Sequence, residues 1–138
     1  MNKKFWLTFI VSFVGLYLLE FVWHSIVLGG FYLKHPQGFR GMENYDPMMF
    51  LWMGIGILLT AFIWVYLFDR FVPEKNLKTG IEFGIIIMIL YYVPWGFINY
   101  ALYVISGYVY LVSTIGGLLH GVIVGALMGW MLQEKKAS

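Results

Sequence analysis

Two side chains capable of acid–base chemistry lie close together inside the first long apolar segment of the chain. They are the carboxylate of Glu20 and the imidazole of His24. Residues four apart fall on the same face of a helix, so these two groups are expected to be neighbours. Ionisable groups at membrane depth are costly and usually functional, which makes this pair the first candidate for a site.

Two further polar side chains are expected at a similar depth on other apolar segments. A rise of about 1.5 Å per residue places Glu20, His24, Asn99 and His120 roughly 7 to 16 Å below the outer edge of a bilayer. A buried carboxylate needs partners to offset the cost of its desolvation. The sequence therefore predicts one intramembrane polar cluster of these four residues, in the outer half of the membrane.

Several roles remain open for this cluster. In proton-coupled transport or ligand binding, Glu20 would be the titrating group, and a lipid or quinone-like molecule is one candidate ligand. In a structural role, the cluster would only fix how the helices pack. As a metal or haem site it would use Glu20, His24 and His120, which are ligand types for Zn²⁺, Fe²⁺ or Mn²⁺. The cofactor, if any, stays undefined.

Aromatic and hydroxyl side chains near this depth are candidates for lining a cavity. Tyr91, Tyr92 and Trp95 make one segment unusually aromatic, and Thr60 lies on another. These residues would suit a flat ligand, although aromatic residues also serve simply as packing in membrane helices. Tryptophan is enriched at membrane surfaces, where we expect Trp6, Trp52, Trp64 and Trp130.

The composition excludes a soluble protein. The chain has 138 residues, of which 61% are hydrophobic and 12% charged, whereas a soluble domain has about a quarter charged. A chain this short cannot hide so much apolar surface in a core, so the surface must face lipid. The net charge of +2 is too small for nucleic-acid binding. We expect one membrane domain spanning residues 1–138, without disulfides because cysteine is absent.

Four segments are long enough to cross a bilayer, and they predict an all-α protein with four transmembrane helices. The expected spans are 5–28, 47–68, 79–105 and 109–132. Gly29 and Gly30 are expected to end the first, and Asp46 to cap the second ahead of Pro47. Thr79 and Glu82 match a capping box at the start of the third.

The basic residues predict the orientation. One side of the membrane would carry Lys3, Lys4, Arg70, Lys75, Lys78, Lys135 and Lys136, and the other Lys34 and Arg40. The positive-inside rule then puts both termini in the cytoplasm and the loop 31–45 outside. The expected location is the bacterial cytoplasmic membrane.

Small residues recur every four positions along the last span: Ser113, Gly117, Gly121, Gly125 and Gly129. Such a ridge lets another backbone approach closely. It would pack against a helix of the same chain, or else form the interface of a homodimer or a partner membrane protein. A weak similarity between 55–60 and 115–120 also raises the possibility of two tandem helix-hairpin repeats.

The chain resembles a bacterial family of small four-helix membrane proteins of unknown function. The similarity rests on Trp23-His24 with 28–31, on 79–84, and on 107–112. His24 stands where that family often has tyrosine, and Glu20 is not part of its pattern. The resemblance implies a fold and no reaction.

No enzyme motif appears in the chain, which favours a role other than catalysis without deciding the matter. The first functional hypothesis is ligand binding or proton-coupled transport through the Glu20 cluster. The alternative is a structural or accessory subunit that acts through the glycine ridge. A metal-dependent or haem-binding protein comes third. The bilayer is the one partner that composition establishes.

Overall fold

The computed structural model describes residues 1–34, 47–103 and 106–133, and all regular structure within these ranges is helical. The elements are α1 (Lys3–Val22), the π-helical turn η1 (Trp23–Val27), α2 (Gly29–Lys34), α3 (Pro47–Phe71), α4 (Leu77–Leu102) and α5 (Gly107–Leu132). Four segments in the described part of the chain are long and apolar enough to cross a membrane: Lys3–Val27, Met48–Phe71, Leu77–Leu102 and Gly107–Leu132. Asp46, Arg40, Lys135 and Lys136 lie outside the described residues.

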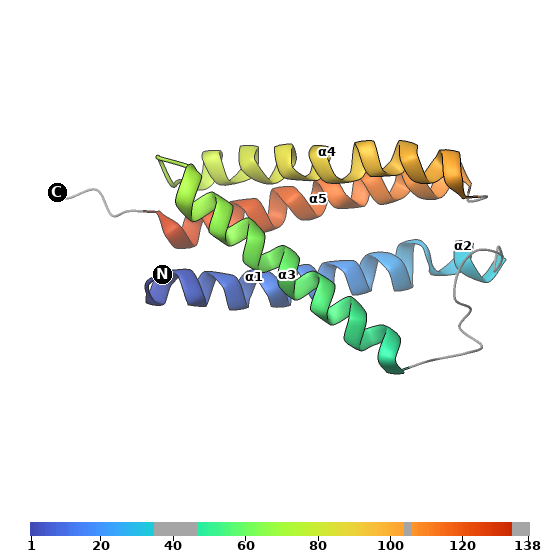
Figure 1. Cartoon of the computed structure of the whole chain (residues 1–138), viewed down its shortest axis with the longest axis horizontal. Coiled ribbons are helices and arrows are strands. Elements are labelled where there is room, and N and C mark those ends of the chain that lie inside the picture. The colour runs from blue at the N-terminus through green and yellow to red at the C-terminus, as the bar shows by residue number, and fades with distance from the viewer. Residues whose placement is uncertain (35–46, 104–105, 134–138) are drawn as a thin grey trace.

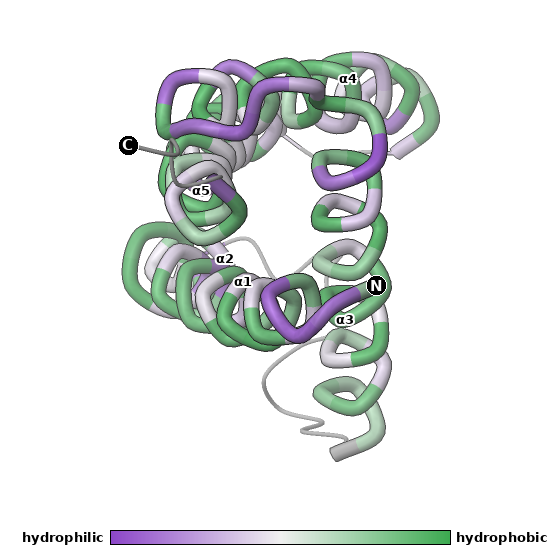
Figure 2. The backbone as a smooth tube through the Cα atoms, turned by 90° about the vertical axis from the view of Figure 1, so that its left-hand side faces the viewer, coloured by the Kyte–Doolittle hydropathy of each residue, from purple (hydrophilic) through white to green (hydrophobic). Residues whose placement is uncertain are grey.

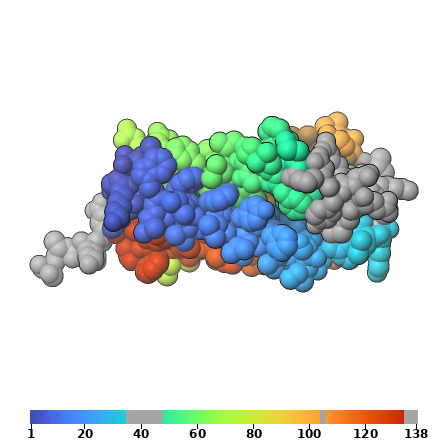
Figure 3. Space-filling view, turned by 90° about the horizontal axis from the view of Figure 1, so that it is seen from below, coloured from blue at the N-terminus to red at the C-terminus, as the bar shows by residue number. Residues whose placement is uncertain are grey.

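The helices form a bundle in which α4 and α5 run side by side and α3 crosses α1 diagonally (Figure 1). Seen from the end, the order around the bundle is α1, α3, α4, α5 (Figure 2). From the side of α1, that helix lies between α3 and α5 (Figure 3). The start of α1 and the end of α5 lie at the same end of the bundle, where Lys4 Nζ donates to the Gln133 carbonyl at 3.1 Å.

The first turn of α4 differs from the expected one. Asn76 is the N-cap, and its side chain accepts from the Thr79 backbone N–H at 3.0 Å while the Thr79 hydroxyl accepts from the Asn76 N–H at 3.1 Å. The expected box of Thr79 and Glu82 is therefore wrong, since Thr79 is the third helical residue. The short side chain of asparagine caps the start of a helix as well as that of serine or threonine does. Glu82 instead lies 3.8 Å from Lys78 one turn away.

The first span ends close to the expected position, at Val27 just ahead of Gly29, but its last turn is π-helical. In this turn, Trp23 to Val27, the Leu28 N–H bonds to the Trp23 carbonyl at 3.0 Å. The short helix α2 then starts at Gly29. The glycines are compatible with helix as well as with a cap, and here the carbonyl of Leu28 accepts from Tyr32 to continue the turn. Single π-helical turns are rare and frequently occur at functional sites.

The glycine ridge of α5 packs inside the chain. A Cβ added at Gly121, Gly125 or Gly129 would collide with the backbone of α4 or of Asn76 just before it, and one added at Gly80 or Gly84 would collide with α5. Gly117 lies against the ring of Tyr92, and Ser113 is half-buried. The ridge is therefore occupied by α4, because glycines on both helices let their backbones touch. Of the two expected roles, packing against a helix of the same chain is the one found in the described residues, and a homodimer or partner protein at this helix stays a prediction.

The tight core of the bundle lies at the end where α1 begins and α5 ends. Phe5, Phe68 and Met128 are fully buried there, and the rings of Phe68 and Phe83 meet at 5.3 Å between α3 and α4. Buried residues on α4 stop at Met88, whereas those on α3 begin at Ala61. The bundle is thus closed at one end and open between α3 and α4 toward the other.

The tryptophans divide into two groups in this arrangement. Trp6, Trp52 and Trp130 are exposed on the outside of the bundle, and their role as anchors at a membrane surface stays a prediction. Trp64 is 5% exposed and belongs to the core. Its expected role as a surface anchor is therefore wrong, because its indole faces the interior of the bundle.

Candidate functional site

Glu20 is the centre of a hydrogen-bonded cluster that joins separate parts of the chain. Its Oε2 lies 3.2 Å from Nε2 of His24, which is one helical turn further along the chain. Its Oε1 lies 3.2 Å from His120 Nδ1 in α5 and accepts from the Tyr92 hydroxyl of α4 at 3.3 Å. The carboxylate therefore has three neighbours that can donate, and donors of this kind replace water around an ionised oxygen.

His24 is positioned by Tyr32 of α2, whose ring lies parallel to the imidazole. The two rings are stacked with centroids 5.9 Å apart, and the Tyr32 oxygen lies 2.7 Å from His24 Nδ1. Burial, followed by the nearby charge of Glu20, raises the pKa of Tyr32 to about 12, so its hydroxyl keeps a proton to donate. The network then assigns the ring proton of His24 to Nε2, which donates to Glu20.

His120 is the most buried member of the cluster, with 3% of its side chain exposed. Trp23 of η1 covers it edge-on, with the ring centroids 5.8 Å apart. The indole of Trp23 fits there because Gly116 has no side chain. A Cβ at position 116 would collide with the indole ring. His120 is therefore enclosed where α5 meets Glu20 of α1 and Trp23 of η1, whereas His24 is 39% exposed and lines the cavity.

Asn99 does not join the cluster. Its side-chain nitrogen donates to the Trp95 carbonyl of its own helix at 2.7 Å. The expected fourth member is thus wrong, because depth alone does not decide which face of a helix points inward. Tyr92, seven residues earlier on α4, supplies the contact instead.

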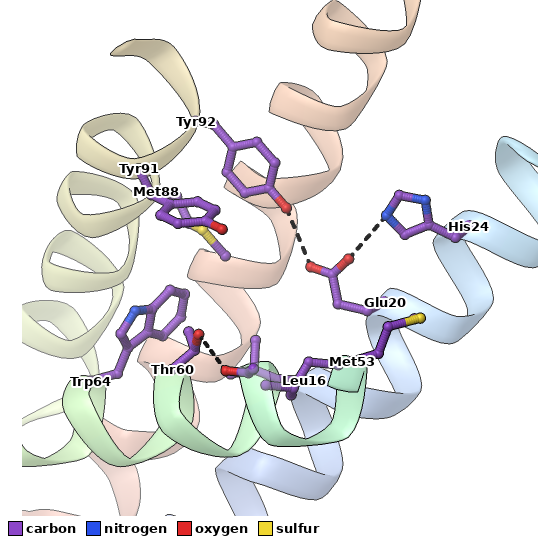
Figure 4. Close-up of a pocket in the computed structure, with 11 residues that line it drawn as sticks. Leu16, Glu20, His24, Met53, Thr60, Trp64, Met88, Tyr91 and Tyr92 are labelled. Atoms are coloured by element: carbon purple, nitrogen blue, oxygen red, sulfur yellow. Dashed lines mark hydrogen bonds and ion pairs between the residues drawn. The ribbon is translucent and has the colours of Figure 1, made fainter. Parts of the chain in front are cut away.

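A cavity of about 290 Å³ adjoins the cluster between α1, α3 and α4 (Figure 4). Glu20 and His24 form one side, and Trp64 and Tyr91 lie on the other. The complete lining is Leu16, Glu20, His24, Met53, Gly56, Ile57, Thr60, Trp64, Met88, Tyr91 and Tyr92. Ligand sites range upward from about 300 Å³ and are mostly apolar with a few polar groups, so this cavity suits a small ligand.

Three of the four aromatic and hydroxyl candidates line this cavity. They are Thr60, Tyr91 and Tyr92. The Thr60 hydroxyl donates to the Gly56 carbonyl at 2.9 Å, so its hydrogen is already used within α3. Trp95 does not line the cavity: it is 49% exposed and stacks on Tyr91 with ring centroids 6.5 Å apart.

The geometry does not favour a metal ion at this cluster. Among the described residues, no group of three or more His, Cys, Asp or Glu side chains is arranged to hold one. The reason is visible at Glu20, whose two oxygens point at different imidazoles. The carboxylate thus bridges His24 and His120, and the three side chains do not converge on one point. The expected metal set of Glu20, His24 and His120 is not supported.

Several residues of the site escaped the sequence reasoning. Tyr32 lies beyond the glycines that were expected to end the first span. Gly56 and Trp64 lie four residues before and after the predicted Thr60 on α3, and Met88 lies four residues before the predicted Tyr92 on α4. That spacing marks one face of a helix and was a usable signal.

The described residues define a class: an all-helical, multi-pass membrane protein with a carboxylate–imidazole cluster beside a partly open cavity. The comparisons with known proteins name nothing more particular, since no family model, no curated protein and no solved structure matches the chain. The resemblance to small four-helix bacterial proteins stays a prediction.

Proposed function

We propose that this protein binds a small ligand inside the membrane, next to Glu20, and that protonation of the Glu20 cluster is coupled to binding. The observation that carries the proposal is the position of the Glu20 carboxylate. It lines the cavity while His24, Tyr92 and His120 bond to it from other turns and helices. Coupling of this kind is the minimum that proton-driven transport requires.

The cost of this arrangement supports a functional role over a purely structural one. Glu20 is the one acidic residue in the described spans that lies away from their ends. Such a group is expensive in a membrane. A polar contact that only joined helices would be most stable when side chains packed around it on all sides. Glu20 instead faces a cavity large enough for a ligand.

We further propose the orientation expected from the basic residues. Among the described residues, Lys3, Lys4, Arg70, Lys75 and Lys78 belong to the end with the termini, and Lys34 to the other. The positive-inside rule then assigns the first end to the cytoplasm and the Glu20 cluster to the outer half of the bacterial inner membrane.

The tandem-hairpin repeat also stays a prediction. The packing lends it no support, because α4 and α5 are joined by facing glycines and α1 and α3 cross diagonally.

The cavity can be tested by filling it. A Cβ added at Gly56 meets no atom within 4 Å, so Gly56→Leu would extend a side chain into the space that Gly56 lines. Gly54→Leu is the matched control, since Gly54 also has open space but does not line the cavity. Residues two positions apart in a helix, such as Gly54 and Gly56, point to nearly opposite faces.

The measurement is thermal unfolding of the purified protein with single-ring aromatic compounds that are cationic, neutral or anionic. We expect at least one class to raise the Tm of the parent and of Gly54→Leu, and not that of Gly56→Leu. If no compound acts on the parent, or if Gly56→Leu responds as the parent does, the proposal is contradicted.

A further inference from the structure

The fixed charge of the cavity lining is negative. Glu20 is its one acidic residue, and no lysine or arginine is among the described residues that line it. An anion would meet the carboxylate without a fixed positive group to offset it. A cation would meet a favourable field that is strong because the surroundings are apolar.

The hydrogen-bonding capacity of Glu20 narrows the kind of cation. A carboxylate has about four acceptor positions, and His24, Tyr92 and His120 occupy three of them in this structure. A ligand with several N–H donors would have to displace these neighbours. A quaternary ammonium needs no acceptor, because its attraction to the carboxylate is purely electrostatic.

The side of the cavity opposite Glu20 suits the body of such a ligand. Trp64 and Tyr91 lie there, with Met88 and Ile57 between the helices. Aromatic rings attract cations through their negative faces and also bury apolar groups. The lining therefore offers one charge and a large apolar surface.

Access to the cavity is from the side of the bundle. Beyond the contact of Phe68 with Phe83, α3 and α4 leave Met53 and Tyr91 exposed at 39% and 58%. Both residues lie inside the apolar spans. A ligand would thus arrive from the lipid between α3 and α4, which requires an apolar body.

These observations point to one ligand class, and we infer that the cavity binds a small organic monocation with an apolar body, which enters from the bilayer and pairs with Glu20. The inference rests on the proposed function, since it names the ligand of the same cavity. It adds the charge of the ligand, the apolar character of its body and its route of entry.

Cation binding should compete with protons. Within the described part of the chain, the titratable groups near Glu20 and the cavity are His24 in η1, Tyr32 in α2, Tyr91 and Tyr92 in α4 and His120 in α5, and the α3 lining adds none. Histidine exchanges protons near neutral pH. An imidazolium at His24 or His120 would neutralise Glu20, so a bound cation favours neutral imidazoles and a proton leaves to solvent.

The test uses three ligands of nearly one shape and different charge, with the full chain in lipid nanodiscs. Benzyltrimethylammonium is the cation, neopentylbenzene is its neutral counterpart with carbon in place of nitrogen, and phenylmethanesulfonate is the anion. Binding is followed by calorimetry against empty nanodiscs. We expect the cation to bind about tenfold or more tightly than the other two, and its affinity to fall from about pH 8 to pH 5.

Variants at Glu20 separate charge from shape. Glu20→Gln should remove the preference for the cation over neopentylbenzene, and Glu20→Asp, which keeps the charge, should retain it. Circular dichroism and gel filtration establish that each variant is folded. An equal affinity for the cation and neopentylbenzene in the parent, a preference that survives Glu20→Gln, or a cation affinity that ignores pH would each overturn the inference.

Failure of this inference is distinguishable from failure of the proposed function. If neopentylbenzene or the sulfonate binds as well as the cation, and Gly56→Leu abolishes that binding while Gly54→Leu does not, the ligand class is wrong and the cavity stands as a ligand site. If none of the three binds in a way that Gly56→Leu abolishes, both proposals fail.

Discussion

At the scale of single residues, the two histidines that contact Glu20 differ in how deeply they are held. His120 is enclosed by Trp23 and α5, with 3% of its side chain exposed. His24 is 39% exposed and is steadied by Tyr32. Both lie 3.2 Å from the same carboxylate. We therefore expect His120 to contribute more than His24 to holding the carboxylate in place.

This difference predicts unequal effects of removing each imidazole. His120→Ala should lower the free energy of unfolding by about 2 kcal/mol or more, because it removes a buried partner of Glu20 and leaves space beneath Trp23. His24→Ala should cost less than about 1 kcal/mol, since His24 is partly exposed and Glu20 keeps His120 and Tyr92 as donors. Unfolding in mixed micelles with increasing SDS measures both. Equal losses would contradict this expectation.

At the scale of the elements, the seam between α4 and α5 decides how the rest of the bundle is arranged. Gly80 and Gly84 face Gly121, Gly125 and Gly129 with backbone against backbone. This close approach sets the rotation of α4, and the rotation in turn presents Tyr92 to Glu20 and turns Asn99 away. The ridge therefore acts on the site indirectly, by orienting the helix that contributes to it.

A single methyl group should disturb this seam. Gly84→Ala should lower stability by about 1–3 kcal/mol, because its Cβ would collide with the backbone at Gly121 and the helices must separate. The comparison is Gly96→Ala on the same helix, where a Cβ meets no atom within 4 Å. That change should cause no loss, since alanine favours helix over glycine. A similar loss in both variants would show that the seam is unimportant.

At the scale of the whole molecule, the described helices are tightly packed at one end and α3 parts from α4 toward the other. Phe5, Phe68 and Met128 close the end that holds the termini. The cavity lies beyond them, at the level of Glu20. The positive-inside rule predicts that the closed end faces the cytoplasm.

The orientation can be measured directly because the chain has no cysteine. Glu74→Cys introduces a single thiol at the closed end, and Lys34→Cys introduces one at the open end. A membrane-impermeant maleimide added to intact cells should label the thiol at position 34 and leave position 74 unlabelled. Permeabilised cells, in which both are reached, are the control. Labelling of position 74 alone in intact cells would reverse the orientation.

The sequence by itself determined the features that depend on composition and on local spacing. An apolar content of 61% requires lipid around the chain, and the lengths of the apolar segments set the number of spans at four. Glu20 and His24 are neighbours because one helical turn separates them. These features need no knowledge of how the helices pack.

Only the tertiary structure decided which distant groups complete the site around Glu20. His120 is one hundred residues away and was predicted from depth, yet the same reasoning wrongly included Asn99. Depth follows from position along a helix, but the inward face follows from its rotation, which the contacts between helices set. The facing glycines of α4 and α5 and the π-helical turn of η1 set that rotation here. They turned a pair of neighbours on one helix into a cluster beside a cavity.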